Sequence, residues 1–196
     1  MIKLERLRTY IGGMTELVTS SDSEPVLLDE GARLLADLVR HDDWLPKPFA
    51  AASGEGYRQY LLHCDPLERF SVVSFVWGPG QHTPIHDHTV WGLIGMLRGR
   101  ERCEEYSDDV DPRGEHLLAP GEIDRVSPTI GDVHRVSNAL ENEASISIHV
   151  YGGNIGAVSR HVYDAGTRAP SAFISGYSRD VVPNLWDRST ETRTGR

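Results

Sequence analysis

The sequence contains only two cysteines, Cys64 and Cys103, which are too few to form a disulfide framework and do not form a CxxC pair. It has no stretch near the roughly 20 apolar residues that a membrane-spanning helix needs. It has no Lys/Arg-rich run, and its net charge of −9 argues against nucleic acid or an anionic membrane as a partner. The first residues lack the apolar core of a secretion signal. We therefore expect a cytoplasmic protein without nucleic-acid or membrane partners.

The composition fits one folded domain. The chain has 196 residues, of which 39% are hydrophobic and 25% charged, values that are ordinary for a globular protein with a sizeable core. We expect residues 1–48 to form a helical segment that belongs to the same domain as a β-barrel over residues 49–170. Residues 171–196 are expected to form a partly flexible C-terminal extension.

The apolar pattern changes from helical to β-like near Pro46 and Pro48. Before these prolines, apolar residues recur at helical spacing from Leu4 to Val18 and again from Leu27 to Leu38. After them come short runs rich in β-forming residues, separated by Gly, Pro and Asp. The expected strands are 69–77, 91–97, 102–106, 123–126, 133–136 and 144–151, and the polar run 100–106 is expected to be exposed. Many short strands at this spacing predict a barrel or sandwich.

Three histidines carry the clearest chemical signal. They lie in two glycine-containing motifs, Gly80-x5-His86-x-His88-x3-Gly92-x6-Gly99 and Gly131-x2-His134-x3-Asn138. In a strand, residues i and i+2 point to the same face, so His86 and His88 can direct two ring nitrogens at one point. A neighbouring strand could add His134 as the third ligand. Three neutral ligands leave positions open on a metal, which predicts a catalytic site rather than a structural one.

A second polar pattern lies in the last expected strand. Ser147, His149 and Tyr151 alternate with apolar residues and therefore share one face of the strand. On the inside of a barrel, these groups would have to hydrogen-bond one another, and this would fix the direction of the tyrosine hydroxyl. The alternative is a strand whose polar face lies in water.

The two histidine motifs resemble the signature motifs of the cupin superfamily, which implies a jelly-roll-like β-barrel with the N-terminal helices packed on its outside. Gly92 stands where most cupins have a glutamate ligand. Three-histidine cupins without that glutamate include the thiol dioxygenases of the cysteine dioxygenase family, and the string from Pro84 to Gly92 resembles their bacterial branch. In the mammalian enzymes, the position of Gly92 is a cysteine that is cross-linked to the active-site tyrosine. Glycine cannot form this thioether.

The resemblance implies an activity and roles for residues. Its members use iron(II), here expected on His86, His88 and His134, to add both atoms of dioxygen to a thiol sulfur and give a sulfinic acid. They carry a Ser-x-His-x-Tyr line beside the iron, which matches Ser147, His149 and Tyr151. The tyrosine would hydrogen-bond to dioxygen or substrate, and the other two would orient it. The expected partners are therefore a small thiol and O2, and the oligomeric state is left open.

Two residues are candidates for binding the substrate carboxylate. In the segment Tyr57-Arg58-Gln59-Tyr60, Gln59 stands where cysteine-specific members have an arginine, which resembles the glutamine-type 3-mercaptopropionate dioxygenases. Arg160 matches an arginine proposed to bind the carboxylate in that subgroup. It could equally be an ordinary surface arginine. We expect 3-mercaptopropionate as the favoured substrate, with cysteine possible.

The sequence is also compatible with other functions. A three-histidine cupin could be a dioxygenase acting on carbon, of the diketone or quercetin type. It could be a non-catalytic protein that binds a metal or small ligand. Three histidines also suit zinc, and affinity alone favours zinc over iron.

Overall fold

The computed structural model describes residues 3–178 and 187–195. Two helices, α1 (Glu5–Ser20) and α2 (Glu24–Val39), precede the short 3-10 helix η1 (Lys47–Ala50) and match the two helical patterns in the sequence. No helix in these ranges is long and apolar enough to cross a membrane. Residues 179–186 of the expected C-terminal extension lie outside the described residues. Beyond them, a short helix, α3 (Ser189–Thr194), forms within the expected C-terminal extension.

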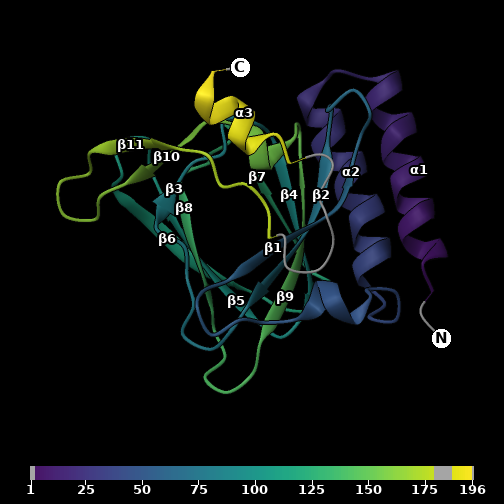
Figure 1. Cartoon of the computed structure of the whole chain (residues 1–196), viewed down its shortest axis with the longest axis horizontal. Coiled ribbons are helices and arrows are strands. Elements are labelled where there is room, and N and C mark those ends of the chain that lie inside the picture. The colour runs from purple at the N-terminus through teal and green to yellow at the C-terminus, as the bar shows by residue number, and fades with distance from the viewer. Residues whose placement is uncertain (1–2, 179–186, 196) are drawn as a thin grey trace.

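The first sheet has five antiparallel strands in the order β1-β2-β9-β4-β7. The strands are β1 (Arg58–Cys64), β2 (Ser71–Trp77), β4 (Gly92–Arg98), β7 (Ile123–Val126) and β9 (Ser145–Tyr151). Its outer face packs on α1 and α2, which lie on the side away from the second sheet (Figure 1). The central strand β9 is buried along its whole length because both of its faces are covered. Ile146, Ile148 and Val150 belong to the helix-packed core, so the alternate residues point into the barrel.

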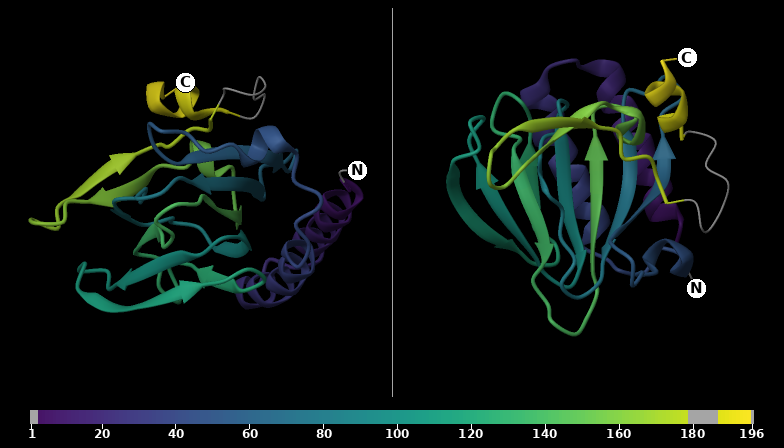
Figure 2. Two further views of the ribbon diagram at one scale, coloured as in Figure 1. Left: turned by 90° about the horizontal axis from the view of Figure 1, so that it is seen from below. Right: turned by 60° about the vertical axis from the view of Figure 1, so that its left-hand side comes forward.

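The second sheet has six antiparallel strands in the order β11-β10-β3-β8-β5-β6. The strands are β3 (Ile85–His86), β5 (Glu101–Tyr106), β6 (Pro112–Leu118), β8 (His134–Asn138), β10 (Arg160–Tyr163) and β11 (Pro170–Phe173), and a second 3-10 helix, η2 (Ile155–Ala157), precedes β10. The two sheets face each other and enclose the barrel interior (Figure 2). The chain is thus mainly β, a barrel of two facing antiparallel sheets with the N-terminal helices packed on its outside, which confirms the predicted fold class.

The expectation of an exposed strand over residues 100–106 is wrong. In β5, Glu101 is fully buried and Cys103 is 2% exposed. β5 lies between β8 and β6, so its inward side chains face the barrel interior, although the run is polar. The turn before it depends on Gly99, whose φ of +80° suits glycine and whose added Cβ would lie 2.9 Å from Ser145 Cα.

Candidate metal centre and substrate cavity

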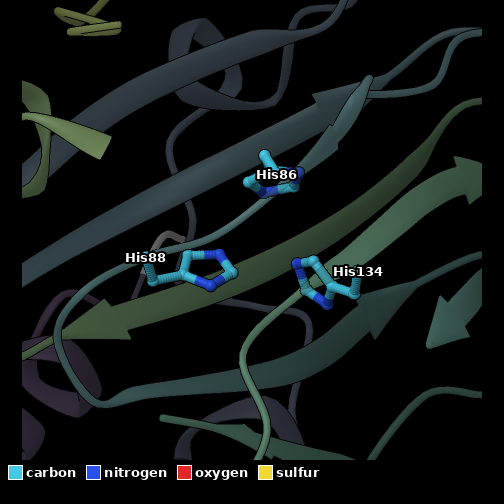
Figure 3. A group of neighbouring side chains, drawn as sticks. All are labelled: His86, His88 and His134. Atoms are coloured by element: carbon cyan, nitrogen blue, oxygen red, sulfur yellow. The ribbon is translucent and has the colours of Figure 1, made fainter. Parts of the chain in front are cut away.

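The fold brings the three histidines together. His86 ends β3 and is the direct register partner of His134, the first residue of β8, while His88 follows two residues after His86. The ring centroids are 4.8 to 4.9 Å apart, and all three rings point toward a common centre (Figure 3). One ring nitrogen from each lies within 4.8 Å of the others. The short antiparallel pairing is therefore what joins the two sequence motifs.

Backbone carbonyls orient two of the rings. The Nδ1–H of His86 donates to the carbonyl oxygen of Pro84 at 3.1 Å, and the Nδ1–H of His88 donates to that of Asp132 at 3.2 Å. This tautomer leaves the Nε2 lone pairs free to face the centre. The Nε2 atom of His88 is buried and has no hydrogen-bond partner among the described residues. A buried nitrogen lone pair without a hydrogen-bond donor is suited to coordinate a metal ion.

The third ring is oriented by a sulfur atom. Nδ1 of His134 lies 3.5 Å from Cys103 Sγ, and burial raises the pKa of the Cys103 thiol, so the sulfur is uncharged. With the Nδ1 atoms of all three rings engaged, the three Nε2 atoms make one neutral donor set.

Burial also keeps the imidazoles uncharged. Desolvation lowers the pKa of His86 and His88 well below the usual value and that of His134 to about 4, and the neighbouring imidazoles add to the effect at His86 and His88. Metal binding requires neutral imidazole, so no proton has to leave these rings at pH 7. The donor set fits a divalent transition metal, iron(II) included.

Asp132 and Asp87 hold the chain around His88 and were not identified from the sequence. Asp132 Oδ2 accepts hydrogen bonds from the backbone N–H groups of His88 at 3.1 Å and Thr89 at 2.9 Å. Asp87 accepts bonds from the backbone and ring of His161 at 2.7 and 2.9 Å, which joins β3 to β10. Their positions beside His134 and between the first two histidines are the sequence signal that could have identified them.

The polar residues of β9 form a continuous chain inside the barrel. Ser147 Oγ lies 2.8 Å from His149 Nε2, and His149 Nδ1 lies 2.8 Å from the Tyr151 hydroxyl. All three residues are buried, so the alternative of a water-exposed polar face is wrong. Desolvation lowers the pKa of His149 and raises that of Tyr151, which keeps the chain uncharged. The Tyr151 ring stacks beside His88 at a centroid distance of 5.3 Å.

Gly92 lies directly behind the tyrosine. It pairs in register with Tyr151 across β4 and β9. A Cβ at this position would lie 2.9 Å from Cδ1 and 3.0 Å from Cε1 of the Tyr151 ring. Any side chain here would press on the ring, and glycine leaves the phenol without a covalent partner.

A partly enclosed cavity adjoins the histidines. Its walls include His86, His134, His149 and Tyr151. The remaining lining is largely aromatic and includes Tyr57, Phe75, Trp77 and Phe173. The metal centre and the polar chain of β9 therefore open into one space.

Arg160 projects into this cavity from the start of β10. It is 4% exposed, so its interpretation as a surface arginine is wrong. Its guanidinium donates from Nη2 to Ser175 Oγ at 2.8 Å and lies 4.6 Å from the Phe173 ring centroid. Its Nε is buried without a hydrogen-bond partner among the described residues, and burial lowers its pKa. A buried cation with an unused donor is suited to bind an anion.

Gln59 lines the same cavity from β1, but one of its two amide N–H groups is already engaged. Nε2 donates to the carbonyl oxygen of Gly176 at 2.6 Å. Its neighbour Arg58 does not line this cavity, as strand alternation predicts, and donates to Ser53 Oγ at 2.9 Å.

The sequence was compared with known proteins. No family model matches it. It is 29% identical over 117 residues to cysteine dioxygenase type 1 of Danio rerio, and the match covers 56% of each protein. It is 28% identical over 90 residues to cysteine dioxygenase type 1 of Homo sapiens, a match that covers 42% of this chain and 44% of that one. The chain is a distant relative of the cysteine dioxygenases. It spans about half the length of the curated relatives it matches.

Solved structures resemble about half of the chain. A double-stranded β-helix protein from Klebsiella pneumoniae has 20% sequence identity and a TM-score of 0.47, with 56% of this chain and 84% of that chain covered. A cupin-like protein from Thermotoga maritima has 20% identity and a TM-score of 0.42, with 51% and 74% covered.

A second group of possible ligands lies beside His134, on the side of its Nδ1 atom. Cys103, His116 and Asp124 bring their donor atoms within 4.8 Å of one another. His116, however, binds a carboxylate with each ring nitrogen, Glu105 and Asp124, both at 3.1 Å. These contacts join β5, β6 and β7, so we interpret the group as an ion-pair network that links the edges of the two sheets.

Proposed function

We propose that this distant relative of the cysteine dioxygenases is a non-haem iron(II) thiol dioxygenase that converts a small thiol carboxylate to its sulfinic acid. The observation that carries the proposal is the meeting of three elements in one cavity: three neutral histidines, the Ser147–His149–Tyr151 chain and a buried arginine. The reaction adds both atoms of O2 to sulfur, and sulfur supplies all four electrons, so no other reductant is needed. Iron(II), held by His86, His88 and His134, would supply the positive charge that favours thiolate sulfur and the redox chemistry that dioxygen requires.

The protein's own groups would position the reactants. The Arg160 guanidinium would bind the carboxylate and place the sulfur near the histidines. The Tyr151 hydroxyl, held by His149, would donate a hydrogen bond to the reacting oxygen or sulfur. The aromatic walls from Tyr57, Phe75 and Trp77 would keep water away from both.

The charges in the cavity favour 3-mercaptopropionate over cysteine. Both thiols carry a carboxylate that Arg160 could bind, but cysteine also carries an ammonium group. None of the described residues that line the cavity is acidic. The ammonium would therefore be desolvated without a counter-charge, which costs binding energy.

Oxygen uptake by the iron-loaded protein tests the proposal. We expect O2 and 3-mercaptopropionate to be consumed in a 1:1 ratio, with lower kcat/KM for cysteine, cysteamine and mercaptosuccinate. The zinc-loaded protein is the control and should be inactive. Turnover of a diketone, or thiol loss without oxygen uptake, would instead support a different cupin enzyme.

Removing the tyrosine hydroxyl should slow the reaction without releasing the metal. In Tyr151→Phe the ring remains beside His88 while one hydrogen-bond donor is lost, which we expect to lower kcat by about 10- to 100-fold. The matched control is Tyr60→Phe, because the Tyr60 hydroxyl donates to the backbone of Ala51 and does not line the cavity. Iron content and kcat are measured for both variants. A normal kcat in Tyr151→Phe would remove the tyrosine from the mechanism.

A further inference from the structure

A buried carboxyl group lies at the inner end of the polar chain. Glu101, the first residue of β5, has no exposed surface and faces β9 across the barrel interior. Ser145 Oγ donates to its Oε1 at 3.1 Å. Its Oε2 is buried and has no hydrogen-bond partner among the described residues.

The surroundings of Glu101 favour its protonated form. Desolvation raises the pKa of Glu101 to about 8, opposed only by the hydroxyls of Ser147 and Ser145, and no cation contributes. Its register partners, Leu118 on β6 and Asn138 on β8, carry no charge. Cys103, which also faces inward from β5, is a neutral thiol because burial raises its pKa. At pH 7 the group is therefore mainly a carboxylic acid, which has one O–H to donate.

Ser147 connects this acid to the chain that ends at the cavity. It faces the barrel interior from the same side of β9 as Ser145, which bonds to Glu101, and like Ser145 it lowers the pKa of the Glu101 carboxyl. Its hydroxyl also lies 2.8 Å from His149 Nε2. Trp77 Nε1–H donates to the same oxygen at 3.4 Å. Polar groups thus follow one another from β5 to the metal centre: Glu101 beside the Ser145 and Ser147 side of β9, then the hydrogen bonds from Ser147 to His149 and from His149 to Tyr151.

A chain of this kind can point in two directions. If Glu101 is protonated, it donates to Ser147, Ser147 donates to His149 Nε2, and His149 Nδ1–H donates to the Tyr151 oxygen. The Tyr151 proton is then free to point into the cavity. If Glu101 is ionised, it accepts from Ser147 and every bond reverses, so the Tyr151 proton is used on His149 Nδ1. The Trp77 bond to Ser147 can persist in both arrangements, because serine oxygen accepts two bonds.

We propose that Glu101 is a positioning residue whose protonation sets the direction of this chain and so keeps the Tyr151 hydroxyl available as a donor to the substrate. The inference rests on the proposed function, in which that hydroxyl assists the reaction. It assigns Glu101 no contact with substrate or metal. It predicts a loss of activity as Glu101 ionises at alkaline pH.

Glu101→Gln separates donation from ionisation. The amide can donate to Ser147 permanently but cannot lose a proton. We expect kcat of the variant at pH 6.5 to stay within about twofold of the wild type. The wild-type decline in kcat as pH rises through about 8 should be absent in the variant. In Glu101→Leu, which cannot donate, kcat at pH 6.5 should be about tenfold below that of the wild type, with no further decline through pH 8 and with iron content unchanged. Glu141→Gln, at an exposed position, should keep the wild-type profile.

Infrared spectroscopy of the metal-free protein provides a readout that does not depend on activity. We expect the C=O band of a protonated carboxyl at pH 7, its loss above pH 8 and its absence in Glu101→Gln. An ionised Glu101 at pH 7, an unchanged alkaline decline in Glu101→Gln, or wild-type kcat in Glu101→Leu would each overturn the inference. If no thiol is oxidised, the proposed function fails, and a band that titrates near pH 8 still supports the buried acid.

Discussion

Replacing His134 by alanine is expected to reduce bound iron to a small fraction of one ion per chain and to lower thiol oxidation by more than about 100-fold. The expectation follows from the ligand count, because three protein nitrogens form the whole donor set and the loss of one leaves two neutral ligands. Changes to groups that only orient a ligand already cost about 10- to 100-fold, so loss of a ligand should cost more. Iron per chain and oxygen uptake, measured on the same sample, check the prediction.

Controls separate loss of the metal from loss of the fold. His134→Gln retains most of the buried volume and should lose iron as His134→Ala does, while both variants keep the wild-type circular dichroism. His82→Ala removes an exposed histidine whose Nδ1 bonds to the carbonyl of Thr83, and it should retain iron and activity. Wild-type iron content in the folded His134 variants would show that the three rings do not form the metal site.

The sequence predicted those parts of the fold that have a regular apolar pattern. Both N-terminal helices and strands such as β9 formed at the expected places because one or both of their faces are buried. β6 was missed because it is an edge strand whose residues are mostly exposed, so it has no apolar repeat. β10 and β11 were missed because each has four residues and lies near the sheet edge.

In the site, too, residues that follow the local strand periodicity could be predicted, whereas residues placed by contacts between distant strands could not. The spacing of His86 and His88, and of Ser147, His149 and Tyr151, follows from strand periodicity and could be read directly. The roles of Glu101 and Cys103 could not be predicted, because both residues lie in the polar run 100–106, which has the pattern of a solvent-exposed strand. Only the packing of β5 in the second sheet gives them their neighbours, the chain of β9 and the ring of His134.

Replacing Arg160 by methionine should raise KM for 3-mercaptopropionate by about 10- to 100-fold, while kcat/KM for cysteamine, which has no carboxylate, should change little. A charge-assisted hydrogen bond contributes about 1.5–3 kcal/mol, which corresponds to this range. Methionine has a long side chain that can still pack on Phe173, so the cavity wall is retained while the charge is lost. KM is measured for both thiols in each variant.

Two further measurements identify the residue that binds the carboxylate: the melting temperature of Arg160→Met and the KM of a Gln59 variant. The guanidinium is buried with an unused Nε, so its removal should not lower the melting temperature of the substrate-free protein. Gln59→Leu should raise KM for 3-mercaptopropionate only about threefold, because the Gln59 amide already donates to Gly176. If the large KM effect instead occurs in Gln59→Leu and Arg160→Met binds normally, the carboxylate lies at β1 rather than at β10. In that case the second N–H of the Gln59 amide donates to the carboxylate, and Gln59→Glu, which cannot donate from its charged form, should lose binding altogether.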